Sequence, residues 1–331
     1  MAPDTTDPSY WLNWRFLLCA TWVLSSMAAA FFLLWRYENF ELNGNERRKA
    51  QLGKMGILSE EEFWMPCLKT IHPGWLLVFR VIAFFMCAVL IIVDIILKGA
   101  SQLYFYTQWT FLLVTIYFGL GSLFSIYGCH QYAKVTDDKI DYLVLDAESR
   151  PYVTPKDCES ANGSPIAKNP GSNEYLNIQK ITRLGGHLFQ IIYQTNAGAV
   201  MLTDFTFWFV IFPFLTSVDF DLDFLQIGMH SLNAVFLICD TALNSLQFPL
   251  FRIAYFILWT SFFVIFQWVL HACISLWWPY PFLDLSSARS PIWYLAVAVL
   301  HVPCYAFFPL IIKIKRCLIL RWFPDTYYLS Y

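Results

Sequence analysis

Long, uninterrupted runs of apolar residues dominate the chain. Runs of about 20 residues are long enough to cross a hydrocarbon core of ~30 Å, and polar segments separate each run from the next. Continuous runs of this length predict helices, whereas a membrane β-barrel would show short segments of alternating hydrophobicity. We therefore predict an all-α, polytopic membrane helix bundle with about seven transmembrane helices. The predicted spans are residues 14–35, 75–97, 107–127, 197–216, 229–247, 252–277 and 291–313.

Composition agrees with a membrane class. Hydrophobic residues make up 58% of the 331 residues and charged residues 14%, against about a quarter charged in an ordinary soluble domain. The net charge of −2 is close to balance and indicates no nucleic-acid partner. Two details of the spans are less regular: Asp204 interrupts the fourth run, and Pro249 marks a tight turn between the fifth and the sixth.

A long polar segment divides the spans into three before it and four after it. Residues 134–185 are rich in Pro, Ser, Asn, Asp and Gly and cannot bury enough apolar surface to fold alone. We predict a cytosolic, mostly disordered connector there. The predicted organisation is an N-terminal tail at 1–13, three helices within 14–127, the connector at 128–187, four helices within 188–313 and a cytosolic tail at 314–331.

The distribution of Lys and Arg predicts the orientation. The segments after the first and third spans and the C-terminal tail are rich in bases, whereas the other side holds mainly Lys98 and Arg289 and the acidic residues Asp219, Asp221 and Asp223. Because basic loops stay on the cytosolic side, we predict a lumenal or external N-terminus and a cytosolic C-terminus. The compartment would be the endoplasmic reticulum, another endomembrane or the plasma membrane.

The fifth predicted span carries an unusual polar stripe. At 100° per residue, His230, Asn233, Asp240 and Asn244 fall within an arc of roughly 80°. Polar groups inside a membrane are expensive and usually face a bundle interior or a wet cavity. The stripe is therefore expected to face protein or water. For the two asparagines, hydrogen bonding between helices is the simpler explanation.

A hydroxyl and an imidazole are predicted at the same depth. The third span begins at Thr107 and enters from the same side as the span that begins near His230, so the two side chains could act as nucleophile and base. The simpler interpretations are that Thr107 caps its helix and that His230 is a satisfied group at the membrane surface. The positions of the two residues in the sequence do not decide between a catalytic pair and these simpler interpretations.

The second half of the chain resembles a known family. The residues that carry this resemblance are the H-x-x-N run that starts at His230, Asp240, the SLQFP run that ends at Pro249, the W-V-x-H run at 268–271 and the YPFL run at 280–283. In their order and spacing they are similar to the androgen-induced-gene family, which includes the androgen-dependent coagulation regulator. Thr107, which follows aromatic residues at the start of a span, resembles the threonine of that family.

The resemblance implies a multi-span hydrolase that cleaves fatty acid esters of hydroxy fatty acids with a threonine nucleophile and a histidine. By position these roles would fall on Thr107 and His230, and we expect Asn233, Asp240 and His271 to contribute to substrate binding. Asp240 lies about 15 Å along the helix from His230 and cannot orient its ring. The candidates for that orienting role are Asp94, Asp219, Asp221, Asp223 and His271.

Two other functions stay open at this level. The same spans resemble the Rolling stone-like membrane proteins, which would make the chain a scaffold or adhesion protein without chemistry. Asp204 and Asp240 near mid-bilayer would suit a transporter, although no internal repeat supports it. No CxxC or HExxH spacing is present, so we expect neither a metal nor a cofactor. The expected partners are the lipid bilayer and an acyl lipid.

Overall fold

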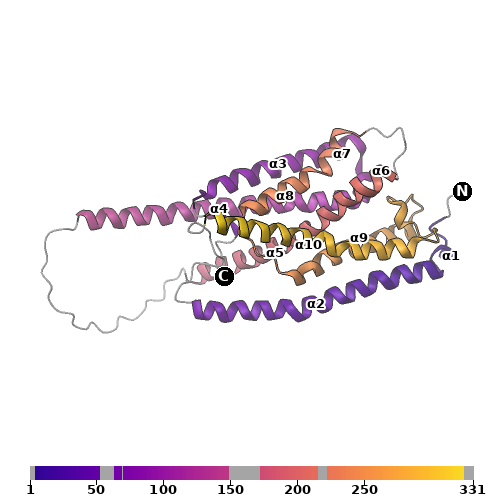
Figure 1. Cartoon of the computed structure of the whole chain (residues 1–331), viewed down its shortest axis with the longest axis horizontal. Coiled ribbons are helices and arrows are strands. Elements are labelled where there is room, and N and C mark those ends of the chain that lie inside the picture. Colours follow the sequence, from indigo (N-terminus) through magenta and orange to yellow (C-terminus); the bar gives the residue numbers. More distant parts are fainter. Residues whose placement is uncertain (1–3, 53–62, 69, 149–171, 215–221, 324–331) are drawn as a thin grey trace.

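The computed structural model describes residues 4–52, 63–68, 70–148, 172–214 and 222–323, and in these ranges the fold is all-α. Helices run side by side along one long axis (Figure 1). Their bounds are α1 Pro8–Trp11, α2 Trp14–Leu52, α3 Pro73–Lys98, α4 Tyr106–Glu148, α5 Ser172–Thr206, α6 Phe212–Phe214, α7 Phe224–Met229, α8 Leu232–Leu243, α9 Ile253–Cys273 and α10 Ser290–Trp322. The only pairing of the β type in the described ranges is an isolated bridge between Pro66 and Asn244.

Within the described ranges, six helices are long and apolar enough to cross a membrane, and the chain is a multi-pass membrane protein. Each contains or overlaps one of the predicted spans. The six are Trp14–Glu38, Pro73–Lys98, Tyr106–Lys134, Leu184–Phe214, Leu250–Cys273 and Ser290–Trp322. Six of the predicted spans are therefore found as long helices, and the turn expected at Pro249 lies between α8 and α9.

The fifth predicted span is different, because it is not one continuous helix. It consists of the short helices α7 and α8, which are interrupted at His230 and Ser231. The two pieces together run antiparallel to α3: Asp223 pairs with Lys98 at one end, and the N–H of Cys67 bonds to the carbonyl of Leu243 at the other. The prediction missed the break because apolar periodicity alone does not distinguish one helix from two pieces with a common face.

The connector also departs from the prediction where it is described. Residues 128–148 continue α4 as helix, and residues 172–187 belong to α5, so the described ends of the connector are ordered secondary structure. The prolines that would stop a helix begin only at Pro151, which leaves the first part of the segment free to extend α4. The centre of the connector, residues 149–171, lies outside the described ranges.

Two hydrophobic cores meet at α5. One contains side chains of α3, α4, α5 and α8, and the other contains side chains of α1, α2, α9 and α10. Different faces of α5 contribute to the two cores, since Ala197 and Val200 belong to the first core and Ala199 and Leu202 to the second. α2 lies along the outside of the bundle, against α9 and α10 (Figure 1).

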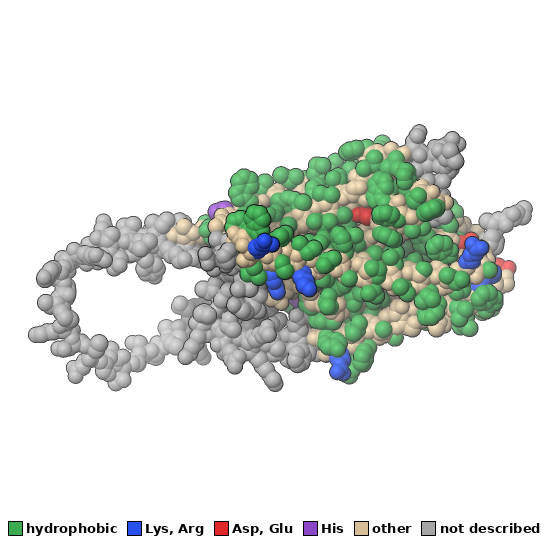
Figure 2. All heavy atoms as spheres, viewed as in Figure 1, with side chains coloured by type: hydrophobic (Ala, Val, Ile, Leu, Met, Phe, Trp, Pro, Cys, Tyr) green, Lys and Arg blue, Asp and Glu red, His purple; other side chains and the backbone are tan. Residues whose placement is uncertain are grey.

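The exterior matches a lipid environment. Figure 2 shows a face covered mostly by hydrophobic side chains, and large apolar residues such as Ile96, Phe209 and Val299 are more than half exposed. Below, the Tyr106 end denotes the end of the bundle that holds the first residues of α2, α4 and α10, and the Pro73 end denotes the opposite one. Tyr10 and Asp284 bond at the Tyr106 end, where α1 meets the segment before α10.

Close packing of α5 against α9 predicts a strong position effect. A Cβ added at Gly198 would lie 2.3 Å from Cδ1 of the fully buried Phe256, whereas one added at Gly228 would lie 3.5 Å from Leu90. We expect Gly198→Ala to lower the free energy of unfolding by about 1–3 kcal/mol through overpacking and Gly228→Ala to change it little. Thermal unfolding in detergent measures both, and equal midpoints for the two variants would contradict this packing.

Candidate functional site

The polar stripe faces the bundle interior, as expected. Asn233, Asp240 and Asn244 are at most 1% exposed, and His230 is 9% exposed. The residues of the stripe contribute to two separate polar sites, His230 and Asn233 to one and Asp240 and Asn244 to the other. The ionic centre comprises Arg80, Tyr117, Asp240 and Asn244; the imidazole site comprises Asp204, Phe207, His230 and Asn233.

The ionic centre is built around a fully buried ion pair. Nε of Arg80 donates to Oδ1 of Asp240 at 2.8 Å, and Nη2 donates to Oδ2 at 3.4 Å. The carboxylate also accepts hydrogen bonds from the hydroxyl of Tyr117 and from Nδ2 of Asn244. Two-point pairing of a guanidinium with a carboxylate is among the stronger polar contacts in proteins, so α3, α4 and α8 are held together at this point.

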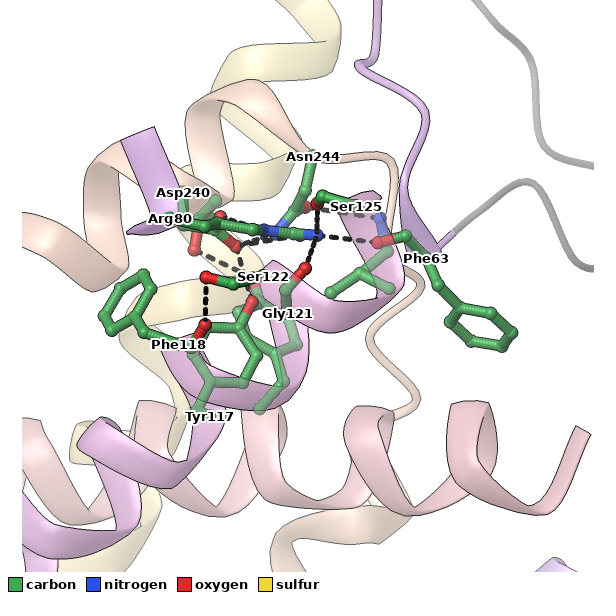
Figure 3. A network of polar contacts seen from close by, with 12 residues as sticks. Phe63, Arg80, Tyr117, Phe118, Gly121, Ser122, Ser125, Asp240 and Asn244 are labelled. Atoms are coloured by element: carbon green, nitrogen blue, oxygen red, sulfur yellow. Dashed lines mark hydrogen bonds and ion pairs between the residues drawn. The ribbon is translucent and has the colours of Figure 1, made fainter. Parts of the chain in front are cut away.

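The third guanidinium nitrogen, Nη1, bonds to groups on the other side of Arg80. Nη1 of Arg80 donates to the carbonyl of Phe63 at 2.7 Å and to Oγ of Ser125 at 3.0 Å. In Figure 3 the side chain of Arg80 lies between Asp240 on one side and Phe63 and Ser125 on the other. Lys315 of α10 closes the site from the Pro73 end by donating to the carbonyls of Thr241 and Asn244.

The chemistry of the ionic centre is structural. Its charges are paired, and its carboxylate has partners on both oxygens, which leaves little freedom for proton transfer or ligand binding. The sequence did not identify Arg80 as the partner of Asp240, although helical periodicity placed Asn244 on the same face as Asp240. The available signal was a lone Arg within the apolar run 75–97, because a base inside a span usually pairs with an acid elsewhere in the bundle.

The imidazole site lies nearer the Tyr106 end, between α5 and the α7–α8 break. The ring of His230 stacks on Phe207 with centroids 3.7 Å apart and planes 1° from parallel. Nδ1 of His230 lies 3.7 Å from Oδ1 of Asp204, which is an ion-pair distance but too long for a hydrogen bond. Nδ2 of Asn233 donates to the same carboxylate oxygen at 3.1 Å. Asp204 therefore lies beside both His230, at the break, and Asn233, in the first turn of α8.

A wide helical turn positions this site. α5 passes into a π-helical segment at Phe207–Ile211, followed by α6 with Pro213. Proline lacks the N–H that an α-helix would bond to the carbonyl four residues earlier, so the regular pattern cannot continue through it, and π turns often occur at functional sites. The turn presents Phe207 to the His230 ring and Nε1 of Trp208 to the His230 carbonyl at 2.7 Å.

The structure does not bring the two predicted catalytic side chains into contact. The hydroxyl of Thr107 lies 3.5 Å from the hydroxyl of Tyr280, on the side of α4 that faces α9 and α10. The neighbouring residue provides the link to the imidazole site, since Nε2 of Gln108 lies 3.5 Å from the sulfur of Met229, which directly precedes His230. Thr107 and His230 therefore share a depth in the bundle but have different neighbours.

The group beside His230 is Asp204, which is not among the five candidates named from the sequence. Asp94 bonds to Gln108 and Lys98, and Asp223 bonds to Lys98 and caps α7. Burial opposes ionisation of Asp223, but the N–H of Gln226 and the charge of Lys98 outweigh it and lower the pKa of Asp223. His271 stacks on Trp278 and bonds to the carbonyl of Gln267. Asp219 and Asp221 lie outside the described ranges.

The ionic centre predicts strong coupling between Arg80 and Asp240. Arg80→Met or Asp240→Leu leaves one buried charge uncompensated and is expected to cost about 3–5 kcal/mol of stability. The double variant removes both charges and should recover much of that loss. Thermal unfolding of the purified protein measures the cycle, with Arg289→Met at an exposed position as the control. A double variant whose loss equals the sum of the two single losses would contradict the pairing.

Comparison of the chain with family models, with characterised proteins and with solved structures found no match.

Proposed function

We propose that this multi-pass membrane protein is a lipid-ester hydrolase in which Thr107 is the nucleophile and His230 the general base and acid. The observation that carries the proposal is the buried pairing of Nδ1 of His230 with Asp204. A carboxylate beside one ring nitrogen can orient the imidazole and leave the other nitrogen to exchange a proton with a hydroxyl. Stacking on Phe207 holds the ring plane.

The proposal assigns a role to each neighbouring group. Asn233 would steady Asp204 through its hydrogen bond, and Asp204 would orient His230, which makes both positioning residues. His271 would contribute to substrate binding through its stack with Trp278. Asp240 would act on substrate binding at a distance, by holding α8 in place through Arg80. The substrate class would be an acyl ester, such as a fatty acid ester of a hydroxy fatty acid, that enters from the bilayer.

Catalysis by this pair requires Nε2 of His230 to reach the Thr107 hydroxyl directly or through one water. The helix break supports this requirement, because His230 lies at the interruption, outside the regular helix of both α7 and α8. The loose 3.5 Å contact between Thr107 and Tyr280 also supports it, since a weak hydrogen bond releases the hydroxyl at little cost.

The second candidate is a membrane scaffold without chemistry. It is favoured by the separation of Thr107 from His230, because Thr107 faces Tyr280 and His230 faces Phe207 and Asp204. Under that function, Thr107 and His230 would be packing residues, and the protein would show no esterase activity.

The hydrolase proposal predicts equal and non-additive losses. Thr107→Ala and His230→Ala should each reduce hydrolysis of a hydroxy fatty acid ester by about 10²–10⁴-fold, and the double variant should be no worse than either single variant. Thr107→Ser should retain activity, because it keeps the hydroxyl. Thr136→Ala and His130→Ala, at exposed positions of α4, are the controls. Undiminished hydrolysis in purified Thr107→Ala or His230→Ala would favour the scaffold.

We also propose seven crossings, with α7 and α8 together as the fifth, a lumenal or external N-terminus and a cytosolic C-terminus. α7 and α8 run antiparallel to α3, from Lys98 to Cys67, which supports counting them together as one crossing and brings the total to seven. The bases of the C-terminal segment, which include Lys313, Lys315 and Arg316, support a cytosolic Pro73 end. The Tyr106 end would then be lumenal or external, where water reaches the imidazole site.

This orientation predicts that Asn162 stays unglycosylated. Asn162 is the acceptor of the NGS run at 162–164, which lies outside the described ranges, and cytosolic acceptors are not modified. An acceptor engineered into the segment at 284–289 should be glycosylated if it stands far enough from the membrane. Mobility shifts after glycosidase treatment of the protein expressed in eukaryotic cells measure both, and a glycan on Asn162 would reverse the orientation.

A further inference from the structure

A pocket lies between α2, α9 and α10, on helices that contribute nothing to the ion pair of Arg80 and Asp240. The pocket is partly open, and the space inside it that the centres of water molecules could occupy is about 80 Å³. Most of its lining is apolar and aromatic, and includes Trp22, Val23, Val264, Phe282 and Trp293. α2, which forms one wall, is the least buried of the six long helices, so this wall separates the pocket from the bilayer.

The buried polar groups of the pocket lining include His301 of α10, which is 5% exposed. Nδ1 of His301 lies 2.7 Å from the carbonyl of Val297. A carbonyl can only accept, so Nδ1 carries the hydrogen and Nε2 presents a lone pair. Within the described ranges, no protein group lies within hydrogen-bond distance of Nε2. A buried acceptor without a donor is costly, and the pocket is therefore suited to a ligand that donates.

The depth of His301 limits the class of ligand. His301 is about 16 Å along α10 from Ser290 and about 18 Å from Lys313, which places it near the middle of the membrane. No Lys, Arg, Asp or Glu is among the residues that line the pocket. A phosphate or carboxylate head would be unpaired at this depth and strongly disfavoured. The site can therefore accept a ligand whose polar head group is small and uncharged.

We propose that the pocket binds a neutral lipid alcohol, a lipid whose only polar group is a hydroxyl, and that this hydroxyl donates to Nε2 of His301. The apolar body of the ligand packs against the aromatic and branched side chains of the lining. Ser26 and Ser261 add hydroxyls to the same lining, which suit the free lone pairs of the ligand oxygen. The bilayer supplies such lipids in two forms, sterols and long-chain alcohols.

The site does not depend on the proposed hydrolase. Phe282 of the pocket stacks on Tyr280, which contacts Thr107, so the two sites are neighbours at the Tyr106 end. None of Thr107, His230 and Asp204 lines the pocket, and none of the variants below changes them. A loss of lipid binding and a loss of esterase activity are therefore separable results.

Photolabelling of the full-length protein in phosphatidylcholine vesicles tests the proposal. The probes are a photoreactive, clickable sterol and a photoreactive, clickable hexadecanol, each competed with its unlabelled alcohol and with the matching hydrocarbon, cholestane or hexadecane. We expect at least one probe to label peptides of α9 and α10, and the alcohol to compete about tenfold better than the hydrocarbon, because one hydrogen bond separates them. The probe whose labelling is reduced by its unlabelled alcohol shows whether the bound lipid is a sterol or a long-chain alcohol.

Two variants of the pocket lining distinguish the contribution of the hydrogen bond to His301 from that of the pocket volume. His301→Phe keeps a ring against Phe256 but removes the acceptor, and should reduce labelling about tenfold. Ala298→Trp keeps His301 but fills the pocket, and should also reduce labelling. His130→Phe, at an exposed position of α4, is the control.

Three results would overturn the proposal: labelling by neither probe, equal competition by the hydrocarbon, or undiminished labelling of folded His301→Phe. If His301→Phe does not fold, the competition on the native protein and Ala298→Trp decide.

Discussion

The bundle depends on one buried ion pair, between Arg80 of α3 and Asp240 of α8. Neither charge could remain inside a membrane protein alone, because an uncompensated buried charge costs several kcal/mol. Together they fix α8 against α3, and the further bonds to Tyr117 and Ser125 extend the constraint to α4. Such a pair contributes less to net stability than to the choice of one arrangement, since apolar replacements of both partners are often tolerated.

The ionic centre, towards the Pro73 end, and the imidazole site, towards the Tyr106 end, differ in how well their polar groups are satisfied. At the Pro73 end, Arg80, Asp240 and Lys315 use their charges on protein partners. At the Tyr106 end, Oδ2 of Asp204 and Oε1 of Gln108 are buried, and no partner lies within hydrogen-bond distance of either among the described residues. Polar atoms that the fold does not satisfy are available to water or a ligand. This contrast separates a structural site from a candidate reactive one along the same polar stripe.

The helix break between α7 and α8 relates these two sites. Because α8 is held by the ionic centre and α7 by Asp223 and Lys98, the interruption at His230 lies between two fixed points. The His301 pocket belongs to the other core, around α9 and α10, and Phe282 of its lining stacks on Tyr280 at the Tyr106 end. The ionic centre and the His301 pocket therefore belong to the two different cores that meet at α5.

Sequence alone determined what depends on local composition. The length of the apolar runs predicted the membrane class and seven spans, six of which are long helices, and helical periodicity placed His230, Asn233, Asp240 and Asn244 on one interior face. Only the tertiary structure decided the partners of these residues. Arg80 is 160 positions from Asp240, and Asp204 is 26 positions from His230, so no local pattern relates them. The π turn at Phe207–Ile211 and the break at His230 set the remaining geometry. Periodicity reports which face of a helix is buried, but the packing of the whole bundle selects which buried faces meet.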